Sequence, residues 1–256
     1  MRATEAIQFA FQRWKQNFNP YLMISLEAFI ITMVAQVVLI PLIVVMYFGF
    51  AFVSVLVESL GLFPIILIFL MFYLLMFAIS AIIGSIINPG LVHTLDGNMR
   101  GRKYEFGDLF RYGKGVMWQY LGLLILNMIV HLIIMVLIMV LVWGPFFLIL
   151  YLAPAVACFL ILILFPITII FLMALLPVQY LVFIIKYMEG VGNWECITRA
   201  YSFVFRHFGF SLALAFLVSL VVVLISMIPF LSIIISLFMP AFMYTLFLEV
   251  YYEMGA

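Results

Sequence analysis

One histidine and three methionines form the strongest candidate for metal chemistry in this sequence. His131 shares a helical face with Met128, Met135 and Met139, because these residues are spaced three and four positions apart. Thioether sulfurs with an imidazole suit Cu(I) or a haem iron. The chain has 17 methionines, so the same stripe also arises from packing, with His131 hydrogen-bonded to Asn127 or to a neighbouring helix. We therefore expect no metal or cofactor, and a metal or redox subunit is the weaker alternative.

Two glutamates interrupt long apolar stretches, where an ionisable side chain is costly and carries a functional hypothesis. They are Glu27 and Glu249. Both lie near the ends of their stretches, where a carboxylate can reach headgroups or water. We expect them to anchor the chain or to pair with Arg13, Lys15 or Lys186. An ion or substrate site is the alternative.

A row of polar side chains runs along the second apolar stretch, at Ser80, Ser85, Asn88 and His93. Small and hydroxyl side chains let membrane helices approach and hydrogen-bond, so this row indicates helix packing, with a pore or lipid pathway as the alternative. The polar candidates within the membrane are Glu27, Asn88, Asn127, His131 and Glu249.

The composition indicates a membrane protein and no enzyme. Of the 256 residues 70% are hydrophobic and 8% charged, with a mean hydropathy of +1.40, whereas soluble domains carry roughly 25% charged residues. The net charge of +1 gives no field that would attract nucleic acid. The sequence has no G-x-S-x-G, H-E-x-x-H, phosphate-loop motif or paired intramembrane carboxylates, so we expect no catalytic residue.

The 11 basic residues are confined to three islands, and these predict the orientation of the chain. The islands contain Arg2, Arg13 and Lys15; Arg100, Arg102, Lys103, Arg111 and Lys114; and Lys186, Arg199 and Arg206. Short cytoplasmic loops of membrane proteins carry Lys and Arg, and translocated loops do not. We therefore expect a multi-pass protein of the cell membrane with both termini and all three islands in the cytoplasm.

Six transmembrane helices satisfy this orientation. A span needs ~20 apolar residues. Windows of this kind lie at about residues 21–48, 63–91, 117–142, 209–227 and 231–251. The uncharged segment 143–185 holds one span or two, with Pro154, Pro166 and Pro177 as break points. One span keeps the third island inside, and it makes residues 146–153 an interfacial piece or the outer end of the fourth span. The expected outer connections are residues 49–61, 143–145 and the turn at Pro229.

A short amphipathic helix is predicted at each island, and it suggests a threefold repeat. Apolar residues recur at helical spacing in all three. They are Ile7, Ala10, Phe11, Trp14 and Phe18; Phe106, Leu109, Phe110, Gly113 and Met117; and Ile197, Ala200, Tyr201, Val204 and Phe208. The first and third sets superpose at one offset, which also aligns Glu5 with Glu195, and the second set fits more weakly. We predict an all-α integral membrane domain over residues 1–256. Each of its repeats, about 1–98, 99–188 and 189–256, has one interfacial helix and two spans, with the basic residues near anionic headgroups.

Three short motifs resemble a group of six-span membrane proteins. Residues 100–110 (RGRKYEFGDLF) resemble the R-G-x-x-x-x-F-x-D-L-F segment after that group's second span. Residues 195–210 resemble its helix before the fifth span, and residues 240–244 (PAFMY) its ending in the last span. The group includes the membrane domain attached to some bacterial glycerophosphodiester phosphodiesterases. The resemblance implies architecture only, because no segment here resembles their catalytic barrel. Glu105 and Phe106 depart from the group, which has a small hydroxyl residue before the helix.

These observations favour a non-enzymatic scaffold or accessory subunit of a membrane complex, with membrane lipids and other membrane proteins as partners and no nucleic acid. The alternative is a small transporter, channel or lipid-handling protein, because transporters use internal repeats and broken helices. A polar cavity near the midplane would favour that alternative.

Overall fold

The computed structural model describes residues 2–60, 62–226 and 229–255, and all secondary structure in these ranges is helical. The all-α prediction is confirmed for this part of the chain. In order, the helices are α1 (Ala3–Gln16), α2 (Phe18–Leu60), α3 (Leu62–Met99), α4 (Asp108–Ile138), the π-helical turn η1 (Met139–Trp143), α5 (Gly144–Leu152), α6 (Pro154–Glu189), α7 (Asn193–Arg206), α8 (Phe208–Ser226) and α9 (Pro229–Met254).

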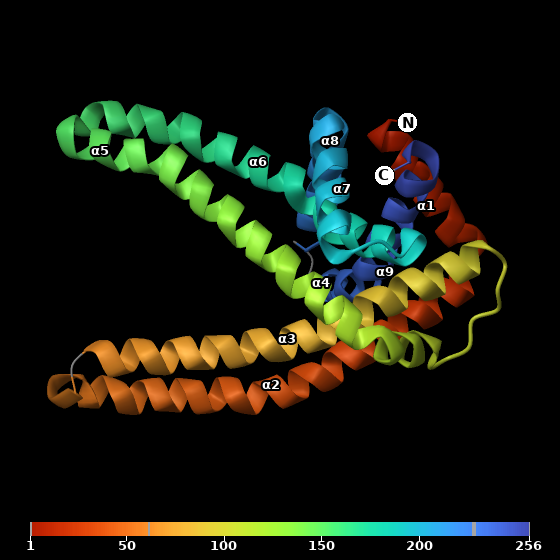
Figure 1. The fold of residues 1–256 in the computed structure, drawn as a ribbon, viewed down its shortest axis with the longest axis horizontal. Coiled ribbons are helices and arrows are strands. Elements are labelled where there is room, and N and C mark those ends of the chain that lie inside the picture. The colour runs from red at the N-terminus through yellow and green to blue at the C-terminus, as the bar shows by residue number, and fades with distance from the viewer. Residues whose placement is uncertain (1, 61, 227–228, 256) are drawn as a thin grey trace.

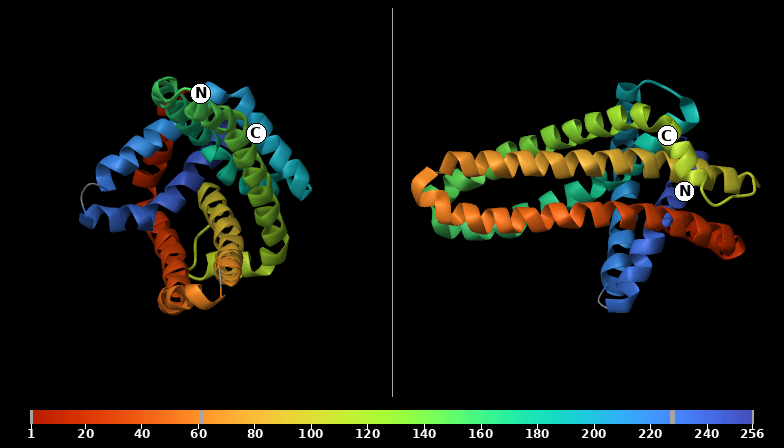
Figure 2. Two further views of the ribbon diagram at one scale, coloured as in Figure 1. Left: turned by 90° about the vertical axis from the view of Figure 1, so that its left-hand side faces the viewer. Right: turned by 90° about the horizontal axis from the view of Figure 1, so that it is seen from below.

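The helices are arranged as three hairpins that meet at one end of the molecule, which we call the base (Figure 1). The hairpins are α2–α3, α4/α5–α6 and α8–α9, and the first two diverge away from the base. Figure 2 shows that α8–α9 projects steeply across the two longer hairpins. Helices α1 and α7 lie at the base, as do both ends of the chain.

The packed core also lies at the base. Its fully buried side chains come from α1 to α4 and α6 to α9 and include Ile24, Leu95, Leu109, Ile184, Leu214 and Phe247. The outer parts of α4 with η1 and of α6 are instead exposed along most of their length, as at Leu141 and Leu162, both 70% exposed. The hairpins are therefore joined at the base and separate beyond it.

Several of these helices are long and apolar enough to cross a membrane. Among the described residues, four stretches qualify by length and hydropathy: Phe18–Pro41, Leu74–Met99, Asp108–Tyr151 and Leu160–Glu189. The pair Asn193–Arg206 and Phe208–Leu224, bent by 90°, adds a fifth if it counts as one span. The chain is thus compatible with a multi-pass membrane protein.

Helix α2 is longer than the sequence predicts. It passes through Pro41 and continues to Leu60, so the connection expected at residues 49–61 is helical over its described part. After Gly49 this stretch holds no glycine or proline before Gly61. In apolar surroundings the backbone must satisfy its own hydrogen bonds, which favours continuing the helix.

The segment 143–185 contains one long helix, α6, which continues through Pro166 and Pro177. The chain reverses at Ala153, whose backbone is non-helical (φ −148°, ψ 76°), and not at residues 143–145. The following Pro154 explains this position, because proline disfavours a helical residue before it and is well placed in the first turn of a helix. Residues 146–153 are not the outer end of the helix that follows, as one alternative predicts, because α5 continues the preceding arm through η1.

Helices α1 and α7 share their length and their ending. Each has 14 residues and is separated from the next helix by one corner residue. The corners are Asn17 (φ −121°, ψ 42°) and His207 (φ −114°, ψ 39°), which correspond at the offset that aligns Glu5 with Glu195. Both helices therefore form as separate elements where the sequence places them.

The second island has no separate amphipathic helix, contrary to the prediction. Residues 102–105 are non-helical, and α4 then runs unbroken from Asp108 to Ile138. Its first turns pack directly on α3, because a side chain at Gly113 would lie 2.0 Å from the Ile86 carbonyl oxygen. This close backbone contact holds the start of α4 against α3 instead of letting it turn away.

Candidate functional site

The base contains three buried carboxylates, and each connects different segments of the chain. They are Glu27 on α2, Asp96 on α3 and Glu249 on α9, exposed by 3%, 3% and 7%. Burial of a charged group is costly without hydrogen bonds or an opposite charge. The partners of these three residues therefore define the polar organisation of the base.

Glu27 accepts hydrogen bonds from the loop that precedes α4 and from the first turn of that helix. Its carboxylate accepts from the backbone N–H of Gly107 at 3.0 Å and of Phe110 at 2.9 Å, and from the Tyr104 hydroxyl. A carboxylate at a helix N-terminus satisfies free N–H groups and is favoured by the helix dipole. Glu27 thus caps α4 from another helix.

The loop conformation makes this contact possible. Gly107 has φ +101°, a conformation that glycine adopts readily, and its N–H there reaches Glu27. Burial, together with the hydrogen bond to Glu27, raises the pKa of the Tyr104 phenol above its ordinary value near 10. The phenol therefore remains a donor to the carboxylate over the physiological pH range.

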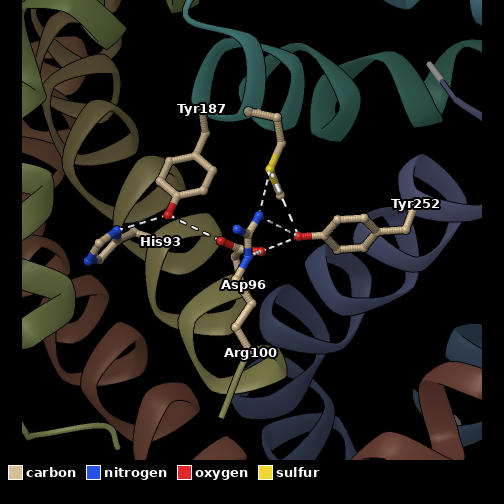
Figure 3. Close-up of polar contacts among 6 residues, drawn as sticks. His93, Asp96, Arg100, Tyr187 and Tyr252 are labelled. Carbon is tan, nitrogen blue, oxygen red and sulfur yellow. Dashed lines mark hydrogen bonds and ion pairs between the residues drawn. The ribbon is translucent and has the colours of Figure 1, made fainter. Parts of the chain in front are cut away.

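Asp96 joins three helices through an ion pair and two tyrosines (Figure 3). Its carboxylate lies 2.9 Å from Arg100 Nε and accepts hydrogen bonds from the hydroxyls of Tyr252 on α9 and of Tyr187 on α6, the latter at 3.3 Å. Arg100 also donates to the Tyr252 hydroxyl at 3.0 Å. Asp96 thus fastens α3 to α6 and α9.

His93 extends the Asp96 cluster toward α4. Its Nδ1 lies 3.2 Å from the Tyr187 hydroxyl, as Figure 3 shows, and its ring stacks on Tyr112 at 3.9 Å between centroids. A cavity of about 20 Å³ adjoins the imidazole and is lined also by Arg102, Lys103 and Asp108. This is room for about one water molecule.

Glu249 connects α9 to the N-terminal helix. Its carboxylate lies 2.6 Å from Arg13 Nε, and Trp14 donates from Nε1 to the Thr245 hydroxyl at 3.3 Å. The Trp14 ring also stacks on Tyr21 at 5.1 Å between centroids. The predicted pairing of Glu249 with Arg13 is confirmed, and α1 is a packed part of the base.

A fourth polar cluster, more exposed than the three carboxylate sites, joins α6, α7 and α9. Arg199 pairs with Glu189 at the end of α6 and with Glu195 in its own helix, and the Tyr251 hydroxyl donates to Glu189 at 3.1 Å. Hydrogen bonding to Glu195 raises the pKa of Arg199 further. Nearby, Lys186 donates to the Val191 carbonyl at 2.7 Å, so it closes the turn after α6 and does not pair with Glu27.

In the described residues, the candidate metal ligands on the face of His131 do not come together at one site. His131 Nδ1 lies 2.8 Å from the Tyr201 hydroxyl on α7 and 3.3 Å from the Asn127 carbonyl oxygen, as the packing alternative predicts. Met128 and Met135 are 40% and 41% exposed, and the Met139 side chain lies outside the described residues. Within the described chain, no three His, Cys, Asp or Glu residues group as metal ligands.

The other predicted residues are distributed around the base and along the arms. Asn127 is buried on α4 with no hydrogen-bond partner described for its side-chain oxygen, and Asn88 lies half-buried on α3 beside Gly84. Arg111 lies 3.6 Å from Asp108. The exposed basic side chains of the base are those of Arg2, Lys15, Arg100, Arg102, Lys103, Arg111, Lys114, Arg199 and Arg206. All three islands therefore lie at the base.

Sequence reasoning missed Asp96 and the partners of Glu27. Asp96 lies four residues before Arg100 and three after His93, a spacing that places all three on one helical face. That spacing was the available signal. The sequence carries no such signal for the contacts of Glu27, because two of its three partners are backbone N–H groups, which residue types do not reveal.

The arrangement of these groups is suited to holding helices together. Each buried carboxylate is bound by at least one donor from another helix or loop, and no nucleophile with an adjacent base occurs among them. The chain matches no protein-family model, and no curated protein or solved structure is detectably similar to it. The resemblance to the phosphodiesterase membrane domains therefore remains a prediction.

Proposed function

We propose that this chain is a non-enzymatic multi-pass membrane protein that acts as a scaffold or accessory subunit of a membrane complex. The base holds its helices in place, and the arms formed by α4/α5 and α6 present apolar surface to other membrane proteins and to lipids. The observation that carries the proposal is the exposure of these arms. In the most apolar part of Asp108–Tyr151, only 6% of the residues are buried inside the molecule.

The exposure covers most of the circumference of the α4 arm, apart from the half-buried face of Val130, Ile134 and Ile138. Consecutive residues such as Leu132 and Ile133 are 63% and 53% exposed, and Val136 and Leu137 are 52% and 50% exposed. A helix that is apolar all round is typical of a membrane span. Because the α4/α5–α6 hairpin diverges from the α2–α3 hairpin, its arms are open to helices of another protein as well as to lipid.

The length of the outer arm fits a bilayer. Its last deeply buried residue before the arm is Asn127, and the helix continues to Leu152. These roughly 25 residues rise ~1.5 Å each, or about 38 Å in all, against a hydrocarbon core of ~30 Å. The base would then lie at the membrane surface, where the basic islands place it in the cytoplasm.

We also propose the six-span topology with both termini in the cytoplasm, in which the first and third units repeat an interfacial helix followed by two spans. The matching lengths and corners of α1 and α7 support a repeat of the first and third units. The common position of the termini at the base supports an even number of crossings. This topology requires the α8–α9 hairpin, which runs across the longer hairpins in Figure 2, to align with them in the bilayer.

The transporter alternative is less well supported by the geometry. Glu27 is occupied by the cap of α4, and His131 bonds to Tyr201. The two cavities described both lie at the base, and neither is lined by Glu27, Asn127 or His131. A specific solute flux carried by the isolated monomer would favour that alternative.

The test replaces leucines and isoleucines of the arms and measures recovery of co-purifying membrane proteins. Leu137→Ala with Leu141→Ala, and Ile163→Ala with Ile167→Ala, shorten exposed side chains on α4/η1 and α6. The control is Leu220→Ala with Leu224→Ala, two exposed leucines at the same spacing on α8. We expect severalfold lower recovery of a stoichiometric partner for at least one arm pair and wild-type recovery for the control. Equal recovery in all three would contradict the proposal.

A further inference from the structure

A groove of about 510 Å³ lies along α7 and reaches the end of α9 at Gly255. Its other lining residues come from α7 and the corner after it: Thr198, Arg199, Ser202, Phe203, Arg206 and His207. It is distinct from the buried carboxylate cluster, and the proposed scaffold function makes no use of it.

The spacing of the lining residues explains why their side chains face the same groove. Residues 199, 202, 203 and 206 are separated by three and four positions, so they share one face of α7. Phe203 is 4% exposed and forms the floor, and its ring packs against His207 at 4.9 Å between centroids. Two guanidinium groups, an imidazole and two hydroxyls surround this floor, and no carboxylate side chain is among its described lining residues.

The two arginines of the groove differ in whether their guanidinium groups are paired with carboxylates. Arg199 is held at one edge by Glu189 and Glu195, which largely balance its charge. Arg206 is exposed, and no ion pair or hydrogen bond of its side chain is found among the described residues. The groove therefore has a guanidinium with free donors, next to the hydroxyls of Thr198 and Ser202.

We propose that this groove binds a phosphate group, carried by an anionic phospholipid headgroup or by a free phosphate. Guanidinium groups bind phosphate oxygens through two parallel N–H donors, and such charge-assisted bonds are the stronger hydrogen bonds of proteins. Arg206 is the main ligand, the Ser202 and Thr198 hydroxyls and the His207 ring are supporting donors, and Arg199 closes the edge. The volume admits a headgroup as well as a bare phosphate.

The experiment uses the full chain and three arginine or lysine variants. Binding is measured with inorganic phosphate by calorimetry, and with nanodiscs of phosphatidylcholine with or without phosphatidylglycerol by lipid retention in native mass spectrometry. Arg206→Gln removes the free guanidinium, and Arg206→Lys keeps the charge without the planar fork. Lys15→Gln removes one exposed charge from the last turn of α1 and serves as the control for net charge.

We expect saturable binding that Arg206→Gln weakens roughly tenfold or more, Arg206→Lys weakens less and Lys15→Gln leaves unchanged. Binding of inorganic phosphate identifies a free phosphate as sufficient, whereas binding of phosphatidylglycerol alone identifies a lipid site. The proposal is overturned if neither probe binds, or if Arg206→Gln and Lys15→Gln weaken binding equally. Arg206 is exposed and outside the core, so size-exclusion profiles should show that both variants fold.

Discussion

The carboxylate of Glu27 accepts a hydrogen bond from the backbone N–H of Phe110 at 2.9 Å, which places a side chain of α2 over the first turn of α4. This contact links the first hairpin to the second without a basic partner. It also makes the loop of residues 100–107 part of the base, because Gly107 and Tyr104 donate to the same carboxylate.

Replacing this carboxylate should weaken the base. Glu27→Gln removes the charge and turns an amide N–H₂ toward one of the three donors. Hydrogen bonds to a charged group contribute about 1.5–3 kcal/mol each, so we expect the free energy of unfolding to fall by a few kcal/mol. Thermal unfolding in detergent measures this, with the exposed Glu5→Gln as the control. An unchanged midpoint for Glu27→Gln would show that the cap is not needed.

The Arg13–Glu249 pair should respond asymmetrically to the loss of either partner. The Glu249 side chain is 9% exposed and that of Arg13 42%. Arg13→Gln leaves a buried carboxylate without its counter-ion, so it should destabilise the protein more than Glu249→Gln. A double-mutant cycle should give a coupling energy between about 0.5 and 3 kcal/mol. Additive effects would mean that the pair does not hold α1 to α9.

The contact between α3 and α4 depends on Gly113. A methyl group there would lie 2.0 Å from the Ile86 carbonyl oxygen, so Gly113→Ala must push the helices apart. We expect a loss of about 1–3 kcal/mol or failure to fold. Gly115→Ala is the matched control, because a methyl group at that position would meet no atom of a neighbouring element within 4 Å. Chromatographic homogeneity and thermal midpoints compare the two, and similar values would show that α3 and α4 are not closely packed.

Sequence alone predicted the all-helical class, and it offered Arg13 as one of three possible partners of Glu249. Charged residue types and apolar runs carry that information directly. The helix boundaries were less predictable. Helix α2 continues to Leu60, where a connection was expected, and the chain reverses at Ala153 and not at residues 143–145. Asp96 was missed for another reason. It lies at the polar end of an apolar stretch, where its burial depends on Tyr187 and Tyr252 from distant helices.

Whether the α8–α9 hairpin crosses the bilayer decides between the possible topologies. In a chain with Cys158 and Cys196 replaced by alanine, Leu224→Cys should react with a membrane-impermeant maleimide from outside intact cells if α8 crosses the bilayer. Gly192→Cys, before α7 at the base, should react only after permeabilisation. If Leu224→Cys also requires permeabilisation, the hairpin stays on the cytoplasmic side and the six-span proposal is wrong.

The central claim is that the arms hold another membrane protein, and native mass spectrometry of the chain extracted with its surrounding lipid tests it most directly. The chain has a mass of 29.4 kDa. We predict a complex that contains this mass and a different protein at a fixed ratio. A chain found only alone or in multiples of its own mass, and able by itself to transport a specific solute, would contradict the account.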